Sequence, residues 1–119
     1  MVDNKIGDEM LIAVAGPYTA ATAEERQRNL DAMNDAAARV FELGHVPLIG
    51  VNAALPVVER LGEGTDRYEA IMKISLAVVD KCEGILMIGE SPGANRERAL
   101  VASKGFPVYT AVEDIPPAS

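Results

Sequence analysis

Glu97 is the residue whose type and position most need a chemical explanation. It follows an apolar run at 84–88 and a turn rich in glycine, serine and proline at 89–93. At about 100° per residue, a helix through this segment places Glu97 between Leu100 and Val101, on its apolar side. A carboxylate in that position is either a reactive group or a glutamate that the helix macrodipole favours near a helix start.

The turn before Glu97 has the composition of a helix start. Ser91 can accept a hydrogen bond from an amide of the first turn, Pro92 suits the first helical position, and Gly93 permits close approach of the backbone to a ligand. Unpaired amides here, up to Ala94, favour an anion such as phosphate. The same residues also suit an ordinary capped helix, and the pattern alone leaves both interpretations open.

A second candidate for ligand contact follows the first apolar segment. Residues 10–15 are continuously apolar, as in a strand that is buried on both faces, and Gly16, Pro17 and Tyr18 interrupt the pattern directly after it. In an open α/β sheet, ligands bind beyond the carboxyl end of a central strand. We therefore expect these three residues to contact a ligand.

Helices and strands alternate between these two segments. We expect first a helix capped by Thr22 and stopped by Gly44, and then an edge strand at 45–49. A short helix follows within 51–61, with Pro56 in its first turn. After it come a linker and candidate lid at 62–66 and a third helix that ends near 80–83. A last strand follows Gly105. Right-handed crossovers make the strands parallel, so the sequence predicts an α/β domain with four or five parallel strands between helices.

Length and charge limit the classes of partner. The chain of 119 residues suits one domain, with residues 1–9 and 111–119 as loose tails. A net charge of −7 argues against a nucleic-acid polymer or a membrane surface as partner, because lysine and arginine hold such partners. We find no apolar run long enough to span a membrane and no signal-peptide pattern, and we expect a cytoplasmic location.

The residues give no support for a metal or a cofactor. The single histidine, His45, and the single cysteine, Cys82, have no partners at metal-ligand spacing, and both fit structural roles better. The residues after the first strand do not match G-x-G-x-x-G, and the chain has no G-x-x-x-x-G-K-[ST] phosphate loop. We therefore expect no metal and no cofactor.

Five short motifs form a recognisable set: AGPYT, ERQRNL, ELGHVPL, SPGANRE and KGFPVY. Together they resemble the nucleoside 2-deoxyribosyltransferase-like superfamily, over nearly the whole chain from about Met10 to Tyr109. The resemblance implies a flavodoxin-like or Rossmann-like three-layer sandwich. It also implies that Glu97 is a nucleophile that attacks the anomeric carbon of a nucleoside or nucleotide and displaces the base. Relatives assemble as dimers or larger, so a homo-oligomer of two or four chains is expected.

Two positions bear on the substrate. Deoxyribosyltransferases proper carry an aspartate six residues before the nucleophile, where this chain has Ser91, and the monophosphate N-glycosidases of the superfamily resemble this chain in having serine. A hydroxyl in place of a negative charge makes room for a 5′-phosphate. Ser75 falls where many relatives have an aspartate that contacts the base, so the resemblance implies substrate contact there without the acid.

The function expected from the sequence is hydrolysis of the base–sugar bond of a nucleoside 5′-monophosphate. Glu97 is the expected nucleophile, Ser91 with residues 92–94 the expected phosphate site, and residues 16–18 the expected wall of the sugar and base pocket. Two alternatives stay open, namely a non-catalytic nucleotide-binding or regulatory module and a nucleoside 2-deoxyribosyltransferase.

Overall fold

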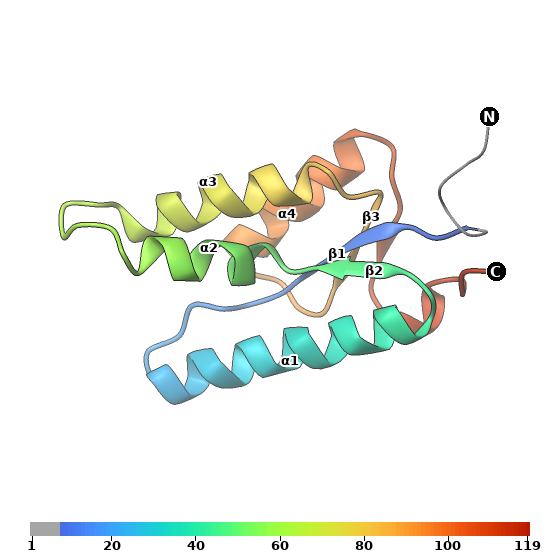
Figure 1. Ribbon diagram of the computed structural model, residues 1–119, viewed down its shortest axis with the longest axis horizontal. Coiled ribbons are helices and arrows are strands. Elements are labelled where there is room, and N and C mark those ends of the chain that lie inside the picture. Colours follow the sequence, from blue (N-terminus) through green and yellow to red (C-terminus); the bar gives the residue numbers. More distant parts are fainter. Residues whose placement is uncertain (1–7) are drawn as a thin grey trace.

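A parallel sheet with helices on both faces forms the centre of the domain (Figure 1). The computed structural model describes residues 8–119, so most of the expected N-terminal tail lies outside the described residues. The strands are β1 (Leu11–Ala15), β2 (Val46–Leu48), β3 (Gly84–Met87) and β4 (Val108–Tyr109), in the spatial order β2-β1-β3-β4. The predicted fold class, a parallel α/β sandwich of the Rossmann-like or flavodoxin-like type, is confirmed, with four strands.

Helices connect the strands at the places that the sequence indicated. They are α1 (Ala23–Glu42), α2 (Gly50–Val58), α3 (Arg67–Val79) and α4 (Pro92–Ser103), and a short 3-10 helix, η1 (Val112–Asp114), follows β4. The side chains of Thr22 and Ser91 each accept a hydrogen bond from the first turn of their helix, so both predicted caps are confirmed. Gly44 after α1 has a φ of 94°, a conformation that glycine adopts without strain.

The start of α2 differs from the prediction. The helix begins at Gly50, so Pro56 lies in its second half rather than in its first turn. The residue before the helix, Ile49, has no polar side chain and provides no cap hydrogen bond, which left the sequence without a start signal at this point. The earlier start places Gly50 near the carboxyl end of β2.

The path of the chain explains where the helices lie. From β1 it runs through α1 to the edge strand β2, then crosses back past β1 through α2 and α3 to β3, and continues through α4 to β4. Right-handed crossovers in opposite directions place α1 on one face of the sheet and α3 with α4 on the other. The connections after β1 and β3 therefore diverge at neighbouring strand ends, the switch point at which open α/β sheets bind ligands.

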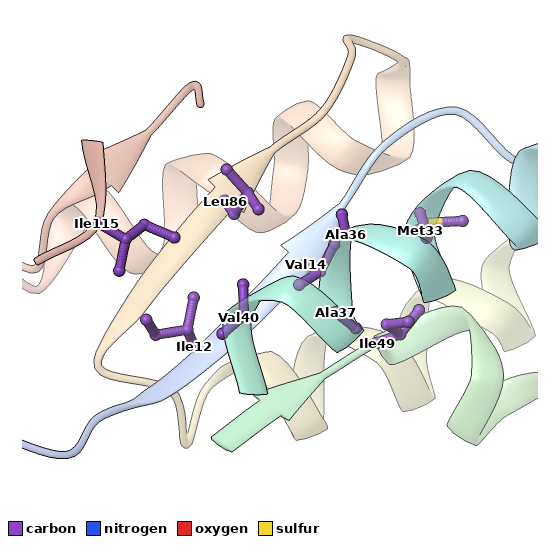
Figure 2. Close-up of a cluster of buried hydrophobic side chains, with 9 residues drawn as sticks. All are labelled: Ile12, Val14, Met33, Ala36, Ala37, Val40, Ile49, Leu86 and Ile115. Atoms are coloured by element: carbon purple, nitrogen blue, oxygen red, sulfur yellow. The ribbon is translucent and has the colours of Figure 1, made fainter. Parts of the chain in front are cut away.

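The two faces of the sheet carry different side chains. Figure 2 shows the cluster on the α1 side, which consists of Ile12, Val14, Met33, Ala36, Ala37, Val40, Ile49, Leu86 and Ile115. The alternate residues of β1, Ala13 and Ala15, belong to the cluster with α3 and α4. Their small side chains allow the helices of that face to pack close to the strand.

The C-terminal segment packs against the domain, which corrects the expectation of a loose tail at 111–119. Ile115 is 2% exposed and belongs to the α1-side cluster. The amide of Ala118 donates a hydrogen bond to the carbonyl of Leu43 at 2.8 Å. The prolines around Ile115 suggested a tail, but burial of its apolar side chain holds the segment in place.

The single histidine and the single cysteine have structural surroundings, as expected. His45 is 1% exposed; the Met10 amide donates to its Nδ1 at 3.0 Å, and its Nε2 lies 2.6 Å from the carbonyl of Pro116. A neutral ring with its hydrogen on Nε2 satisfies both contacts. Cys82 is 1% exposed, and burial raises the pKa of its thiol to about 11, which makes the thiol unreactive.

Replacement of Ile115 tests whether the C-terminal segment is part of the core. Ile115→Ala removes buried apolar atoms and is expected to lower the free energy of unfolding by about 2 to 4 kcal/mol, measured by urea denaturation. Val57→Ala is the control, because Val57 is 50% exposed and its truncation is expected to cost less than about 1 kcal/mol. Equal losses in the two variants would contradict a buried role for Ile115.

Candidate functional site

A cavity of about 780 Å³ lies at the carboxyl ends of β1 and β3, a volume typical of small-molecule sites. We call the residues that line it the cavity wall. The predicted site residues in the wall are Gly16, Tyr18, Ser75, Ser91, Pro92, Gly93, Ala94 and Glu97. The fold thus brings together segments that are far apart in the sequence.

Pro17 is the predicted site residue that is not in the wall. A methyl group added at Gly89 would lie 2.9 Å from Cδ of Pro17. The proline therefore packs on the connection between β3 and α4, where only a glycine leaves room for it. The contact holds the two loops of the switch point together.

Glu97 lies in α4 with its carboxylate in the wall. The residue is 8% exposed, and its Oε2 is buried with no hydrogen-bond partner among residues 8–119. Burial raises the pKa of Glu97 from 4.5 to about 7. The neighbouring Arg96 and Arg98 point elsewhere and pair with Glu69 and Glu90 at the surface. An isolated buried carboxyl is costly, and such perturbed groups are concentrated at functional sites.

The free oxygen of Glu97 lies beside two residues from other helices. A methyl group added at Gly50 would lie 2.9 Å from Glu97 Oε2 and 2.9 Å from Ser75 Cβ. Ser75 is 2% exposed, and its Oγ also has no partner in the described part of the chain. Gly50 was not predicted as a site residue. Its position directly after the second strand, like that of Gly16 after the first, is the signal that could have found it.

The start of α4 combines a cap with one free amide. Ser91 Oγ accepts from the amide of Ala94 at 3.1 Å, and the Ser91 carbonyl accepts from Asn95. Because Pro92 has no N–H, Gly93 has the first amide hydrogen of α4, and that amide has no acceptor within residues 8–119. A methyl group at Gly93 would lie 3.0 Å from Sδ of Met72, so α4 meets α3 closely at this glycine.

Other wall residues were missed by sequence reasoning. They are Thr19, Ala20, Arg26, Val51, Arg67, Tyr68, Ile71 and Met72. Arg26 lies near the start of α1, where its Nη1 donates to the carbonyl of Ala20 at 3.0 Å, and Arg67 is the first residue of α3. Both helices start at the carboxyl edge of the sheet, and that position could have indicated the two arginines. They give the wall two cations in a chain of net charge −7.

Residues 8–119 contain no group of three or more histidine, cysteine, aspartate or glutamate side chains placed to hold a metal ion. Over the same residues, no helix is long and apolar enough to cross a bilayer.

The chain belongs to a protein family described as "Domain of unknown function (DUF4406)", whose model matches residues 10–110. One curated relative is the bicarbonate transporter BicA of Picosynechococcus sp., which is 30% identical over 76 residues. That match covers 64% of this chain and 13% of the transporter. The chain therefore corresponds to a small part of that protein, and the similarity assigns no activity to the cavity.

Replacing Glu97 by glutamine is expected to change the pH dependence of stability. Because burial raises the pKa of Glu97 from 4.5 to about 7, the folded protein binds this proton more tightly than the unfolded chain does. The wild type therefore loses free energy of unfolding as the pH rises from about 4.5 to about 7, by an amount on the order of 3 kcal/mol. Glu97→Gln has no such ionisation, so its stability relative to the wild type should increase over that range.

Urea denaturation at pH 5, 6, 7 and 8 measures the difference between the two proteins. Glu69→Gln serves as the control, because Glu69 is an exposed glutamate of α3 paired with Arg96 at the surface. A stability difference between Glu97→Gln and the wild type that stays constant from pH 5 to pH 8 would contradict the raised pKa.

Proposed function

We propose that this member of a family of unknown function is an N-glycosidase that hydrolyses the base–sugar bond of a nucleoside 5′-monophosphate, with Glu97 as the nucleophile. The observation that carries the proposal is the buried Glu97 carboxylate, which lines a cavity at the switch point of the sheet and whose Oε2 has no hydrogen-bond partner among residues 8–119. The resemblance of the five sequence motifs to the nucleoside 2-deoxyribosyltransferase-like superfamily supports the same reaction.

Wall residues can supply each step of this reaction. The ionised carboxylate of Glu97 attacks C1′ of the sugar, the C1′–N bond breaks, and its electron pair passes to the base, which takes up a proton. Water then adds to C1′ and gives a proton to the group that protonated the base, the ester bond to Glu97 breaks, and the carboxylate is restored. Glu97 is the one carboxylate in the described wall, so the phenol groups of Tyr18 and Tyr68 are the candidates to protonate the departing base.

The burial of Glu97 suits a nucleophile. With a pKa of about 7, the carboxyl group is ionised in about half of the molecules at neutral pH. Its Oε2 is buried with no hydrogen-bond partner among the described residues, and the residue lines the cavity, so little reorganisation precedes attack on the sugar by the other oxygen. The same isolation is difficult to explain for a glutamate that serves only to stabilise the fold.

The start of α4 is the proposed phosphate site. The free amide of Gly93 and the hydroxyl of Ser91 lie at the positive end of the α4 dipole. A methyl group at Gly93 would lie 3.9 Å from Cε1 of Tyr68, so the start of α3, and with it Arg67, adjoins the start of α4. An arginine beside a helix start is a favourable arrangement for a phosphate dianion.

Turnover of nucleotides tests the proposal directly. Purified protein incubated with ribo- and deoxyribonucleoside 5′-monophosphates of each common base is expected to release free base from at least one of them, as measured by chromatography. Glu97→Gln is expected to lower the rate by ~10³-fold or more, because the nucleophile is lost, while Glu69→Gln retains it. For the wild type, kcat/KM should rise with pH through about 7, as the Glu97 carboxylate becomes ionised.

The outcomes separate the candidate functions. No base release from any substrate, or release that is unchanged in Glu97→Gln, contradicts the hydrolase. Thermal stabilisation by nucleotides without turnover points to a non-catalytic nucleotide-binding module. Base exchange that requires an acceptor base and prefers unphosphorylated nucleosides points to a 2-deoxyribosyltransferase.

Replacing Arg67 tests the assignment of the phosphate site. Arg67→Gln is expected to raise KM for the monophosphate by ~10-fold with little change in kcat, because a distant phosphate contact acts equally in the ground and transition states. Arg60→Gln is the matched control, since Arg60 lies between α2 and α3 and is not in the wall. Equal KM values in the two variants would remove Arg67 from the phosphate site.

The remaining expectations from the sequence stay predictions. They are a small nucleotide or nucleoside as the bound partner, a homo-oligomer of two or four chains, and a cytoplasmic location. Size-exclusion chromatography with light scattering measures the oligomeric state.

A further inference from the structure

We propose that Ser75 is a positioning residue for Glu97: its hydroxyl donates a hydrogen bond to the Glu97 carboxylate, in a space that Gly50 keeps free of any side chain. The inference deepens the proposed function, since it takes Glu97 as the nucleophile. Its main test measures Glu97 itself and needs no substrate.

Three helices meet at this point. Gly50 is the first residue of α2, Ser75 lies in α3 and Glu97 lies in α4. Glu97 Oε2 and Ser75 Cβ are each 2.9 Å from the place that a Gly50 methyl group would occupy, so they are separated by at most twice that distance. The Cα of Ser75 is 3.0 Å from the same place. Any side chain at position 50 would push these two residues apart.

The hydrogen-bonding needs of the two side chains match. Ser75 Oγ and Glu97 Oε2 are both buried, and neither has a partner among residues 8–119. Leaving such a group unpaired costs about 1 to 3 kcal/mol. The serine hydroxyl can turn about χ1 and rotate its hydrogen, whereas an ionised carboxylate can only accept. A hydrogen bond from Ser75 to Glu97 therefore satisfies both groups at once.

Other hydroxyl groups of the wall are less suited to this task. Ser91 Oγ already accepts a hydrogen bond from the amide of Ala94 and lies at the proposed phosphate site, the start of α4. Tyr18 is only partly buried, and Thr19 and Tyr68 are exposed, so water can satisfy the hydroxyl groups of all three. Ser75, at 2% exposure, has no such access to water.

The hydrogen bond has a consequence for both charge and geometry. It favours the ionised form of Glu97 and so opposes the effect of burial, and it holds one carboxylate oxygen so that the other faces the cavity. The remaining charged or titratable groups around Glu97 are Tyr18, Arg26, Arg67 and Tyr68 in the wall and Cys82 in the core behind it. Burial first, and then the negative charge of Glu97, raise the pKa of the Cys82 thiol to about 11.

The test is a titration of Glu97 followed by carboxyl-carbon NMR on protein labelled in its glutamate side chains. The Glu97 signal is identified by its absence from the spectrum of Glu97→Gln. In Ser75→Ala the midpoint is expected to rise by about one pH unit relative to the wild type, because a hydrogen bond to the charged form is lost. Ser103→Ala is the matched control, since Ser103 lies exposed near the end of α4 with its hydroxyl bonded to the Leu100 carbonyl, and it should leave the midpoint unchanged.

An unchanged or lower midpoint in Ser75→Ala would overturn the proposal. If Ser75 has a purely structural role, Ser75→Ala would lower the melting temperature without moving the Glu97 midpoint, and that result would also contradict the proposal. If Ser75→Ala does not fold, Ser75→Cys keeps the shape with a weaker donor, and a smaller rise of the midpoint is expected.

Kinetics distinguish this proposal from the proposed function. If the protein hydrolyses a nucleotide, Ser75→Ala should lower kcat by ~10-fold with little change in KM, because the nucleophile is misplaced rather than the substrate. A higher midpoint in Ser75→Ala, together with no turnover by the wild type, would support the hydrogen bond and contradict the glycosidase. Turnover by the wild type, together with an unshifted midpoint in Ser75→Ala, would support the glycosidase and contradict the hydrogen bond.

Discussion

The pairing of β1 with β3 is the interaction on which the rest of the structure depends. These neighbouring strands are parallel, with Ile12 opposite Gly84 and Ala15 opposite Met87, although about seventy residues separate them along the chain. Because the chain leaves them toward opposite edges of the sheet, their carboxyl ends diverge and leave a space between the two connections. The residues after β1, Gly16 to Tyr18, and the start of α4 after β3 are placed by that divergence.

The same arrangement lowers the stability of the folded protein at Glu97 and makes that carboxylate suitable for reaction. Burial raises the pKa of Glu97, whose Oε2 has no partner in the described part of the chain, so the folded protein at neutral pH carries a group that would be more stable in water. The cost is tolerable because the apolar cluster on the α3 and α4 side of the sheet, which includes Ala94 and Val101, supports α4 independently of its glutamate. A strained or unpaired group inside a well-packed frame is a common property of sites that bind or react.

Local patterns predicted the elements, and contacts between distant segments decided what was missed. The caps at Thr22 and Ser91 and the apolar strands were evident because each signal lies within a few residues. Gly50 was missed because its importance comes from side chains of two other helices. The packing of Ile115, and the contact of Pro17 with Gly89, likewise depend on partners that no short segment contains.

His45 contacts segments near both ends of the described chain, and these contacts determine from which side of the domain the chain leaves. Its ring contacts Met10, just before β1, and Pro116, close to the C-terminal residue, both at the amino end of the sheet. The cavity lies at the carboxyl end of the sheet. A polypeptide attached after Ser119 would therefore leave the domain from the side away from the cavity. Such an attachment would leave the entrance of the cavity free.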